Sequence, residues 1–356
     1  MRTPAERSKQ CGGCDGPAKL PSTRRQPANT RHHRPGTRRP SCNATRVLKS
    51  HEFQIEPSKP FRLDLTAWAL RRNARNSVDR WSTSTYERVL SLAGRPVALA
   101  VTQMAGPDTP RLSVVLSGRQ IDQPTEELVR GTLDRLVGLS VDLSPFAAMA
   151  APDPLLGPLA ARMRGLKPPR FPTVFEALVN GIACQQLSLA VGIQLLNRLA
   201  ADRGKAVSDD PDSPRAFPDP EELAPLDTDD IKRHGFSTSK ARTIIEVAQA
   251  VVADRLDLKA LHGLEDGAVI ERLTSLRGVG RWTAEYVLLR GLGRLHIFPG
   301  DDVGAHNKLR HLFRTDTALD YDAVQRLVAR WHPHAGLVYF HLLLDSLSRA
   351  GLVDQP

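Results

Sequence analysis

Two glycines one residue apart, Gly278 and Gly280, interrupt a strongly helical pattern and constrain the fold more than any other feature of the chain. Apolar residues at helical spacing lead into them, and a second helical pattern begins directly after them. Because each glycine costs about 1 kcal/mol in a helix interior, the pair predicts a tight turn between two helices. Such a helix-hairpin-helix presents unpaired backbone N–H groups and the positive end of the second helix to an anion. Nucleic-acid phosphate is the natural candidate, because backbone contacts to it fix register without reading sequence.

A second break follows at Pro299-Gly300, and Asp301-Asp302 opens another helical pattern. Acidic residues after proline and glycine are an ordinary helix start, so a lone Pro-x-Asp would be interpreted as a cap. Here the turn follows a Leu-x-Gly-Val-Gly hairpin and a Trp-Thr-Ala helix. In this combination the segment resembles the helix-hairpin-helix/Gly-Pro-Asp superfamily of DNA glycosylases, and within it the 3-methyladenine DNA glycosylase II branch.

The resemblance implies that Asp302 is the catalytic aspartate and leaves Asp301 as the helix cap. A glycosylase extrudes the damaged nucleotide from duplex DNA and cleaves the bond between base and sugar. Cleavage builds positive charge on the sugar, so an ionised carboxylate held beside it stabilises the transition state and can orient water. A place in the first turn of a helix favours the ionised form.

Trp282 and Tyr286 are the expected walls of the base pocket. They are four residues apart on the helix after the hairpin, hence on one face. Alkylated purines are cationic and stack well on aromatic rings, and the resemblance implies that such rings line the pocket; core packing is the alternative. Residues 339–343 of the last helical segment are less clearly equipped with pocket aromatics than the family pattern, which leaves the substrate range open.

Further DNA contacts are expected at the hairpin and at a Gln-Gln pair between two predicted helices, residues 173–184 and 188–199. A polar pair at such a turn is usually a solvated loop, but the family resemblance makes Gln186 the side chain that fills the gap left by the extruded nucleotide. Lys240 is a candidate phosphate contact. The expected DNA-binding residues are Gly278, Val279, Gly280, Arg281, Thr283, Gln185, Gln186 and Lys240.

Bifunctional relatives carry a lysine where this chain has Trp282, and that lysine attacks the sugar before the strand is nicked. No lysine lies between Ala260 and Asn307, and no cysteine follows Cys184, so an iron–sulfur cluster of that branch is not expected. The sequence therefore predicts a monofunctional enzyme that uses water. No cofactor is expected, with a monovalent cation at the hairpin left open. The alternatives are a non-catalytic DNA-binding module and a lyase-type glycosylase for oxidised bases.

The net charge of +10 says little about the folded part of the chain. The first 50 residues hold 12 lysines and arginines against two acids, which accounts for the whole excess. Residues 276–314, by contrast, carry a local +4 around the hairpin, a footprint suited to phosphate. The expected partner is double-stranded DNA with a damaged base, bound by a monomer. The preferred lesion stays open among 3-methyladenine, 7-methylguanine, hypoxanthine and ethenylated bases.

Residues 1–55 are rich in Arg, Pro, Ser and Thr and cannot bury enough apolar surface to order themselves, which predicts a disordered basic tail. It could serve as a nucleic-acid arm or a targeting peptide, or reflect a start placed too far upstream. Cys11 and Cys14 have metal-ligand spacing near His32, His33 and Cys42, but a zinc site needs a framework that closes around four ligands. The few cysteines and the absence of an apolar leader favour a cytoplasmic protein, and the uncharged run 177–197 holds too many polar groups for a membrane span.

The predicted fold class is α+β. Alternating residues at 61–65, 85–92, 96–103 and 112–116 predict short strands, and residues 125–138 predict a helix. They would form a small antiparallel sheet-and-helix domain over residues 56–148. The rest is helical with proline punctuation. It is expected to form two mostly helical domains with a cleft between them: one of residues 172–294, which holds the hairpin, and a second of 149–171 and 295–356.

Overall fold

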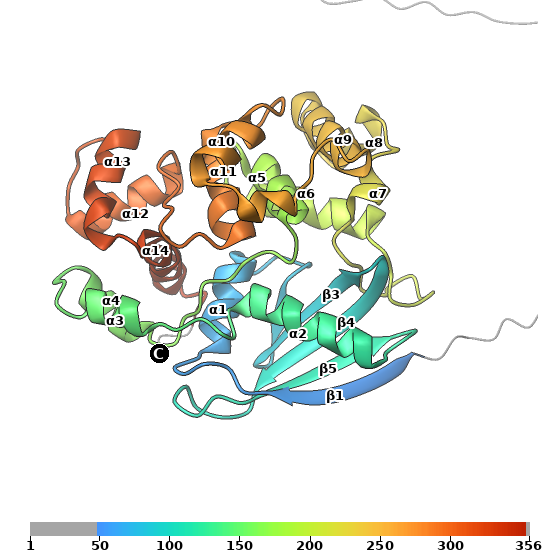
Figure 1. Ribbon diagram of the computed structural model, residues 1–356, viewed down its shortest axis with the longest axis horizontal. Helices are drawn as coiled ribbons and strands as arrows, with labels where there is room; N and C mark the ends of the chain where they lie inside the picture. Colours follow the sequence, from blue (N-terminus) through green and yellow to red (C-terminus); the bar gives the residue numbers. More distant parts are fainter. Residues whose placement is uncertain (1–47, 354–356) are drawn as a thin grey trace, which may run out of the picture. The chain divides into compact units, whose positions relative to one another are not determined.

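The computed structural model describes residues 48–353, and the first part of this range forms a five-stranded antiparallel sheet with two helices (Figure 1). In sheet order β1-β5-β4-β3-β2, the strands are β1 (Lys49–Ile55), β5 (Leu112–Gly118), β4 (Arg95–Gln103), β3 (Thr85–Leu92) and β2 (Arg80–Ser82). The three strands predicted between residues 85 and 116 are confirmed. Alternate side chains of β3–β5 face a buried core on one side of the sheet.

Strand β1 corrects the predicted boundary of the tail at residue 55. Its residues pair with β5 from Lys49 opposite Gly118 to Ile55 opposite Leu112. Only Phe53 in this strand is buried, so its composition gave little sign of folding, whereas backbone pairing at a sheet edge requires little burial. The rest of the predicted tail and the cysteine–histidine cluster lie outside the described residues.

Two helices cover one face of the sheet, α1 (Leu63–Arg71) and α2 (Gln123–Val137) (Figure 1). Helix α2 confirms the predicted helix, and its N-cap Asp122 accepts a hydrogen bond from Thr125 N at 3.0 Å. The strand predicted over residues 61–65 is wrong, because α1 starts there. Its apolar residues serve two cores: Leu63 packs under the sheet, whereas Leu65 packs among the C-terminal helices. Burial on two faces produced the misleading alternation.

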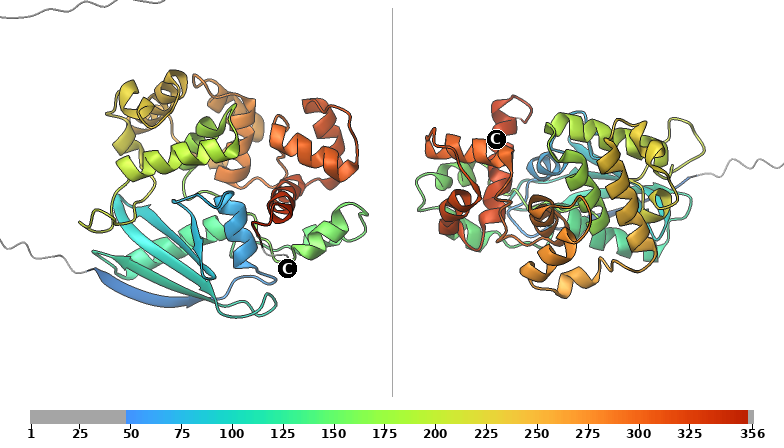
Figure 2. Two further views of the ribbon diagram at one scale, coloured as in Figure 1. Left: turned by 180° about the vertical axis from the view of Figure 1, so that it is seen from behind. Right: turned by 90° about the horizontal axis from the view of Figure 1, so that it is seen from above.

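The remaining described residues form helices connected by turns, seen from two more sides in Figure 2. These are α3 (Ser144–Ala150), α4 (Leu156–Arg162), α5 (Val174–Cys184), α6 (Leu189–Arg203), α7 (Pro220–Leu223), α8 (Thr228–Lys232), α9 (Thr238–Val252), η1 (Ala260–Gly263), α10 (Asp266–Thr274), α11 (Arg281–Val287), the π-helical η2 (Leu288–Leu292), α12 (Val303–Phe313), α13 (Tyr321–Val328), η3 (Ala329–Trp331) and α14 (Ala335–Arg349). None of the helices in the described part of the chain is long and apolar enough to cross a membrane.

These helices build two hydrophobic cores. The first holds apolar residues of α5, α6, α9, α10 and α11 and includes Tyr286. The second is built by α3, α4, α12, α13 and α14 with one face of α1, and contains the fully buried Trp331. The boundary predicted at residue 148 falls inside α3, whose Phe146 packs in the second core. The hairpin leads into α11, which packs in the first core, and the Pro299-Gly300 turn leads into α12, which packs in the second. The hairpin and the turn therefore belong to different cores.

Candidate active site

Asp302 lies at the start of α12, where three hydrogen bonds converge on its carboxylate. Oδ1 accepts from Ala305 N at 2.8 Å, which makes Asp302 the N-cap. Oδ2 accepts from Tyr339 Oη at 2.8 Å and from Trp282 Nε1 at 3.3 Å. The side chain is partly exposed, whereas Asp301 is exposed and caps nothing. The assignment of the cap to Asp301 was wrong, since Asp302 both caps α12 and carries the candidate catalytic carboxylate.

A buried glutamate fixes the turn that presents Asp302. Glu285 of α11 is 3 % exposed, and it accepts hydrogen bonds from Gly300 N at 3.0 Å and Tyr321 Oη at 2.7 Å. On the other side of the turn, His306 Nε2 lies 2.5 Å from Gly300 O. A Cβ at position 300 would collide with the Tyr321 ring, so glycine is required there. Burial raises the pKa of Glu285, with the Tyr321 hydroxyl opposing that shift.

Tyr339 of α14 is a site residue that the sequence did not single out. Residues 339–343 looked poorly equipped for the site, yet the Tyr339 phenol reaches Asp302 and its ring packs edge-on against Phe298 at 5.6 Å. Burial and the negative charge of Asp302 hold the pKa of Tyr339 well above its ordinary value. The phenol therefore stays protonated and acts as a donor to the carboxylate.

Trp282 and Tyr286 stack on one another with ring centroids 5.4 Å apart, as their spacing along one helix face predicts. Trp282 is partly exposed and contacts Asp302. Tyr286 is 3 % exposed, and its hydroxyl oxygen accepts from Arg72 Nη1 at 2.7 Å. Of the two stacked rings, Trp282 is the more accessible and contacts the Asp302 carboxylate, whereas Tyr286 lies behind it in the protein interior.

The hairpin exposes its glycines and buries the residue between them. Gly278 has φ +76°, and a Cβ there would collide with the Thr243 hydroxyl, so both conformation and space require glycine. Gly280 is the N-cap of α11 and faces open space. Val279 is 5 % exposed, and its N–H donates to Leu276 O. The outward donors are therefore those of the glycines and of the first turn of α11.

Three of the predicted DNA contacts form hydrogen bonds within the protein, two of them at the hairpin and one at the C-terminus of α5. Gln185 Nε2 donates to Gly278 O at 3.0 Å and to Thr283 Oγ1 at 2.8 Å. Thr283 is 1 % exposed, so its side chain cannot contact DNA. Lys240 Nζ donates to Ala183 O at 2.9 Å and Gln185 O at 2.6 Å. Lys240 therefore satisfies carbonyls at the C-terminus of α5, as a cation near a helix C-terminus commonly does. These two hydrogen bonds by themselves account for the position of the ammonium group.

Gln186 lies at the exposed tip between α5 and α6 with φ +52°. Its neighbour Leu187 is 43 % exposed, which is unusual for a leucine held in a tight turn. Ser188 caps α6 as predicted, accepting from Val191 N at 3.4 Å. Sequence reasoning passed over Leu187, although an apolar residue between two polar neighbours at a helix–helix turn was a usable signal.

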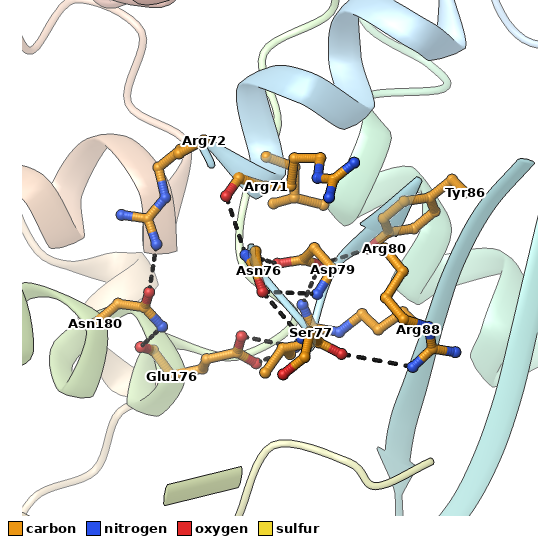
Figure 3. Close-up of polar contacts among 12 residues, drawn as sticks. Arg71, Arg72, Asn76, Ser77, Asp79, Arg80, Tyr86, Arg88, Glu176 and Asn180 are labelled. Carbon is orange, nitrogen blue, oxygen red and sulfur yellow. Dashed lines mark hydrogen bonds and ion pairs between the residues drawn. The ribbon is translucent and has the colours of Figure 1, made fainter. Parts of the chain in front are cut away.

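A buried polar network joins the sheet domain to helices α5 and α11 (Figure 3). From β3, Arg88 donates to both carboxylate oxygens of Glu176 and to Asp79 Oδ1 at 2.6 Å. At the end of α1, Arg72 Nη2 donates to Asn180 Oδ1 at 2.6 Å while Nη1 reaches Tyr286. Sequence reasoning missed Arg72, because an arginine at a helix end is usually solvated.

Comparisons with known proteins identify what the chain is similar to. Residues 179–334 match the HhH-GPD superfamily of base excision DNA repair proteins. The chain is 29% identical to the DNA-3-methyladenine glycosylase of Bacillus subtilis (strain 168), over 63% of this chain and 74% of that one. It is also 29% identical to a putative DNA-3-methyladenine glycosylase of the same organism, over 48% of this chain but only 58% of the relative.

Among solved structures, a 3-methyladenine DNA glycosylase from Archaeoglobus fulgidus superposes with a TM-score of 0.72 at 24% identity, covering 83% of this chain and 98% of that one. An 8-oxoguanine glycosylase/lyase from Clostridium acetobutylicum gives 0.65 at 16% identity, covering 83% and 97%. At these identities the structures show a shared fold, and the sheet domain is part of it.

Proposed function

Because the chain belongs to the HhH-GPD superfamily of base excision DNA repair proteins, we propose that it is a monofunctional DNA glycosylase that extrudes alkylated purines from duplex DNA and hydrolyses the N-glycosidic bond. The observation that carries the proposal is the Asp302 carboxylate. It is partly exposed, fixed by three donors and adjacent to the Trp282 ring. The relatives named DNA-3-methyladenine glycosylase support this class of substrate.

Asp302 would act on the sugar. As the bond to the base breaks, C1′ becomes cationic, and a fixed anion beside it stabilises that charge without reorganising. Tyr339 and Trp282 hold Oδ2, and the N-terminal dipole of α12 favours the negative charge. Water then adds to C1′, and no cofactor is needed for that step.

The hairpin would hold the DNA strand through phosphate. Gly278 and Gly280 expose backbone donors, and the exposed Arg281 adds positive charge beside them. At the tip between α5 and α6, Gln186 and Leu187 are both exposed and adjacent, so either side chain could enter the base stack. All of these residues come from one chain, and we expect a monomer to act on double-stranded DNA.

A non-catalytic DNA-binding module is the main alternative, and Asp302 separates the two. Such a module needs the hairpin glycines, but it has no need of a partly exposed carboxylate with a phenol and an indole donating to it. A lyase-type glycosylase needs an amine that attacks the sugar. Lys308, one candidate near Asp302, donates to Gly304 O at 3.0 Å, and burial lowers its pKa while the Asp302 charge opposes that shift.

The decisive test is Asp302→Asn. Asparagine is also a good N-cap and can still accept from Ala305 N, so the fold should survive. We expect base release from methylated DNA to fall at least about 100-fold, because a preorganised charge at the reacting centre is lost. DNA affinity, measured by fluorescence anisotropy, should be unchanged or improved. Equal loss of binding and turnover would make Asp302 a structural residue.

Strand cleavage tests the lyase alternative. With a water-based mechanism, product strands stay intact until alkali is added, and borohydride traps no covalent complex with DNA. Trapping that disappears in Lys308→Met would overturn the monofunctional assignment and identify the amine.

A further inference from the structure

A cavity of about 390 Å³ lies between α3, α4 and α14. Figure 1 shows α3 and α4 next to α14, and the cavity walls include Phe146 of α3, Ala160 of α4 and His341 of α14. A volume of this size is typical of sites for small molecules. No residue of the hairpin and no residue that contacts Asp302 lines it. The chemistry proposed for DNA therefore makes no use of this cavity.

His341 brings an unpaired hydrogen-bond acceptor to the cavity. The residue is 2 % exposed, and its Nδ1 lies 2.8 Å from Leu337 O. A carbonyl oxygen only accepts, so Nδ1 carries the hydrogen and Nε2 keeps its lone pair. Burial lowers the pKa of His341 to about 4, which keeps the ring neutral at neutral pH. Nε2 has no hydrogen-bond partner within residues 48–353.

The packing of the imidazole directs Nε2 toward the cavity. Nδ1 is turned to the preceding turn of α14, and the Phe146 ring packs against the imidazole with centroids 4.8 Å apart. In the described part of the chain, the side-chain nitrogens that lack both a partner and access to solvent do not include His341 Nε2. The space open to this nitrogen is the cavity that His341 lines.

The walls of the cavity are apolar and carry no uncompensated charge. Apart from His341, the polar residues that line it are Ser144 and Arg164. Arg164 donates to Asp108 through Nη1 at 3.2 Å and through Nη2 at 2.5 Å, so a carboxylate already balances its charge. An ordered water needs two to four polar partners, and a single acceptor among apolar walls supplies one. The acceptor is therefore better matched by a donor on an apolar molecule.

We propose that this cavity binds a neutral aromatic molecule with one N–H or O–H donor, of the class of indole or a simple phenol. Alanines of α3 and α4 leave room for a ring, Phe146 supplies an aromatic neighbour, and the donor satisfies His341 Nε2. The bound molecule contacts α3, α4 and α14, and α14 also carries Tyr339. The site is independent of the proposed function.

Indole and 1-methylindole are the test probes, because they share a ring system but only indole has a donor. Each is titrated into full-length protein that carries nitrogen-15 histidine. Indole should bind with a Kd of about 1 mM or below and shift the Nε2 resonance of His341. The loss of one hydrogen bond should weaken 1-methylindole by about tenfold. Indole-3-carboxylate should also bind about tenfold more weakly than indole, because its charge leaves water without a counter-ion.

Two variants separate the acceptor from the space. In His341→Leu the preference for indole over 1-methylindole should disappear, because leucine offers no acceptor. Ala147→Met places a longer side chain at the cavity and should weaken both ligands by at least about tenfold. Ala148→Met is the matched control, since Ala148 is the next exposed residue of α3 and does not line the cavity. It should leave both Kd values unchanged.

A preference for indole that persists in His341→Leu would overturn the role of Nε2. Unchanged binding in Ala147→Met, or equal weakening in Ala148→Met, would place indole elsewhere, for example on the Trp282 ring, and overturn the site. Absence of indole binding at about 10 mM would do the same. Tighter binding of indole-3-carboxylate than of indole would mean that Arg164 exchanges Asp108 for the ligand, which overturns a neutral ligand class. Base release from methylated DNA is measured separately, so none of these outcomes bears on the proposed function.

Discussion

The hairpin at residues 276–283 and the turn at 299–302 are both short glycine-containing breaks between helices, yet they expose opposite parts of the chain. At the hairpin, Val279 and Thr283 are buried and the glycine backbone faces outward. At the turn, the backbone of Gly300 is occupied by Glu285 and His306, and the Asp302 side chain is what remains partly accessible.

This difference follows from what each break has to contact. Phosphate recurs identically along DNA, so a grip built from backbone N–H groups serves every sequence. A transient charge on one sugar needs an anion at one place, which only a fixed carboxylate supplies. The side chains that support the hairpin are neutral hydrogen-bonding groups such as Gln185, whereas the turn is supported by a buried acid, Glu285.

Removing that acid should produce the largest effect. In Glu285→Ala, the Gly300 N–H and the Tyr321 hydroxyl lose their acceptor, and the turn is free to shift. A misplacement of about 1 Å at the reacting centre costs about 100-fold in rate, so base release should fall by that order. DNA affinity should change less than about threefold, because the hairpin keeps its own supports. Single-turnover kinetics and anisotropy measure the two quantities.

Glu285→Gln is the control for this variant, since the amide oxygen can still accept from Gly300 N. It should retain most of the activity. If Glu285→Ala weakened DNA binding as much as base release, the independence of turn and hairpin would be refuted.

Acid should destabilise the core behind the turn through His341 of α14. Burial lowers the pKa of His341 from 6.5 to about 4, and the ring is 2 % exposed. Above pH 6.5 neither state binds the proton; between pH 6.5 and 4 only the unfolded state does, so stability falls as pH falls and levels off below 4. By pH 5 the loss from this residue is about 2 kcal/mol.

Denaturant unfolding of wild type and His341→Leu at pH 7.5 and pH 5 isolates this contribution. The leucine variant should lose about 2 kcal/mol less stability over that interval. An identical loss in both proteins would show that the imidazole is protonated in the folded state or is not buried in it.

The parts of the site that the sequence predicts are those formed by residues close together in the chain. The hairpin, its glycines, the helix after it and the Pro-Gly-Asp-Asp turn each have a local signature, because glycine, proline and cap residues act within a few positions. The stacking of Trp282 on Tyr286 follows from helical spacing alone. Strands β3 to β5 and helix α2 are predictable for the same reason.

What sequence could not supply is the set of partners from distant segments. Tyr339 reaches Asp302 across 37 residues and Arg72 reaches Tyr286 across 214, and no local pattern marks either. The DNA contacts predicted at Lys240 and Thr283 show the converse. Lys240 and Thr283 adjoin the motif as polar residues should, but the orientation of each side chain is set by its partners, which only packing reveals. These are two backbone carbonyls for Lys240 and the Gln185 side-chain amide for Thr283.

Substitutions of the two hairpin glycines distinguish DNA affinity from the stability of the fold. Gly278→Ala places a Cβ at φ +76° against Thr243 and should destabilise the fold by about 1–2 kcal/mol. Gly280→Ala has φ −97° and open space around it, so its Tm should be unchanged. The Gly280 methyl group projects into the open space of the proposed phosphate site and should weaken DNA binding about tenfold, or about 1.4 kcal/mol. Thermal melts and anisotropy distinguish the two effects; unchanged affinity in Gly280→Ala would refute the hairpin as the grip.

Lys240 and Arg281 give the smallest and most specific contrast. A lysine or arginine that neutralises one phosphate contributes about 0.9 to the slope of log K against log salt. Arg281→Met should reduce the slope by that amount, because its side chain is exposed beside Gly280. Lys240→Met should leave the slope unchanged and lower Tm, since the ammonium satisfies two carbonyls at the end of α5. A reduced slope in Lys240→Met would mean that its ammonium exchanges those carbonyls for a DNA phosphate.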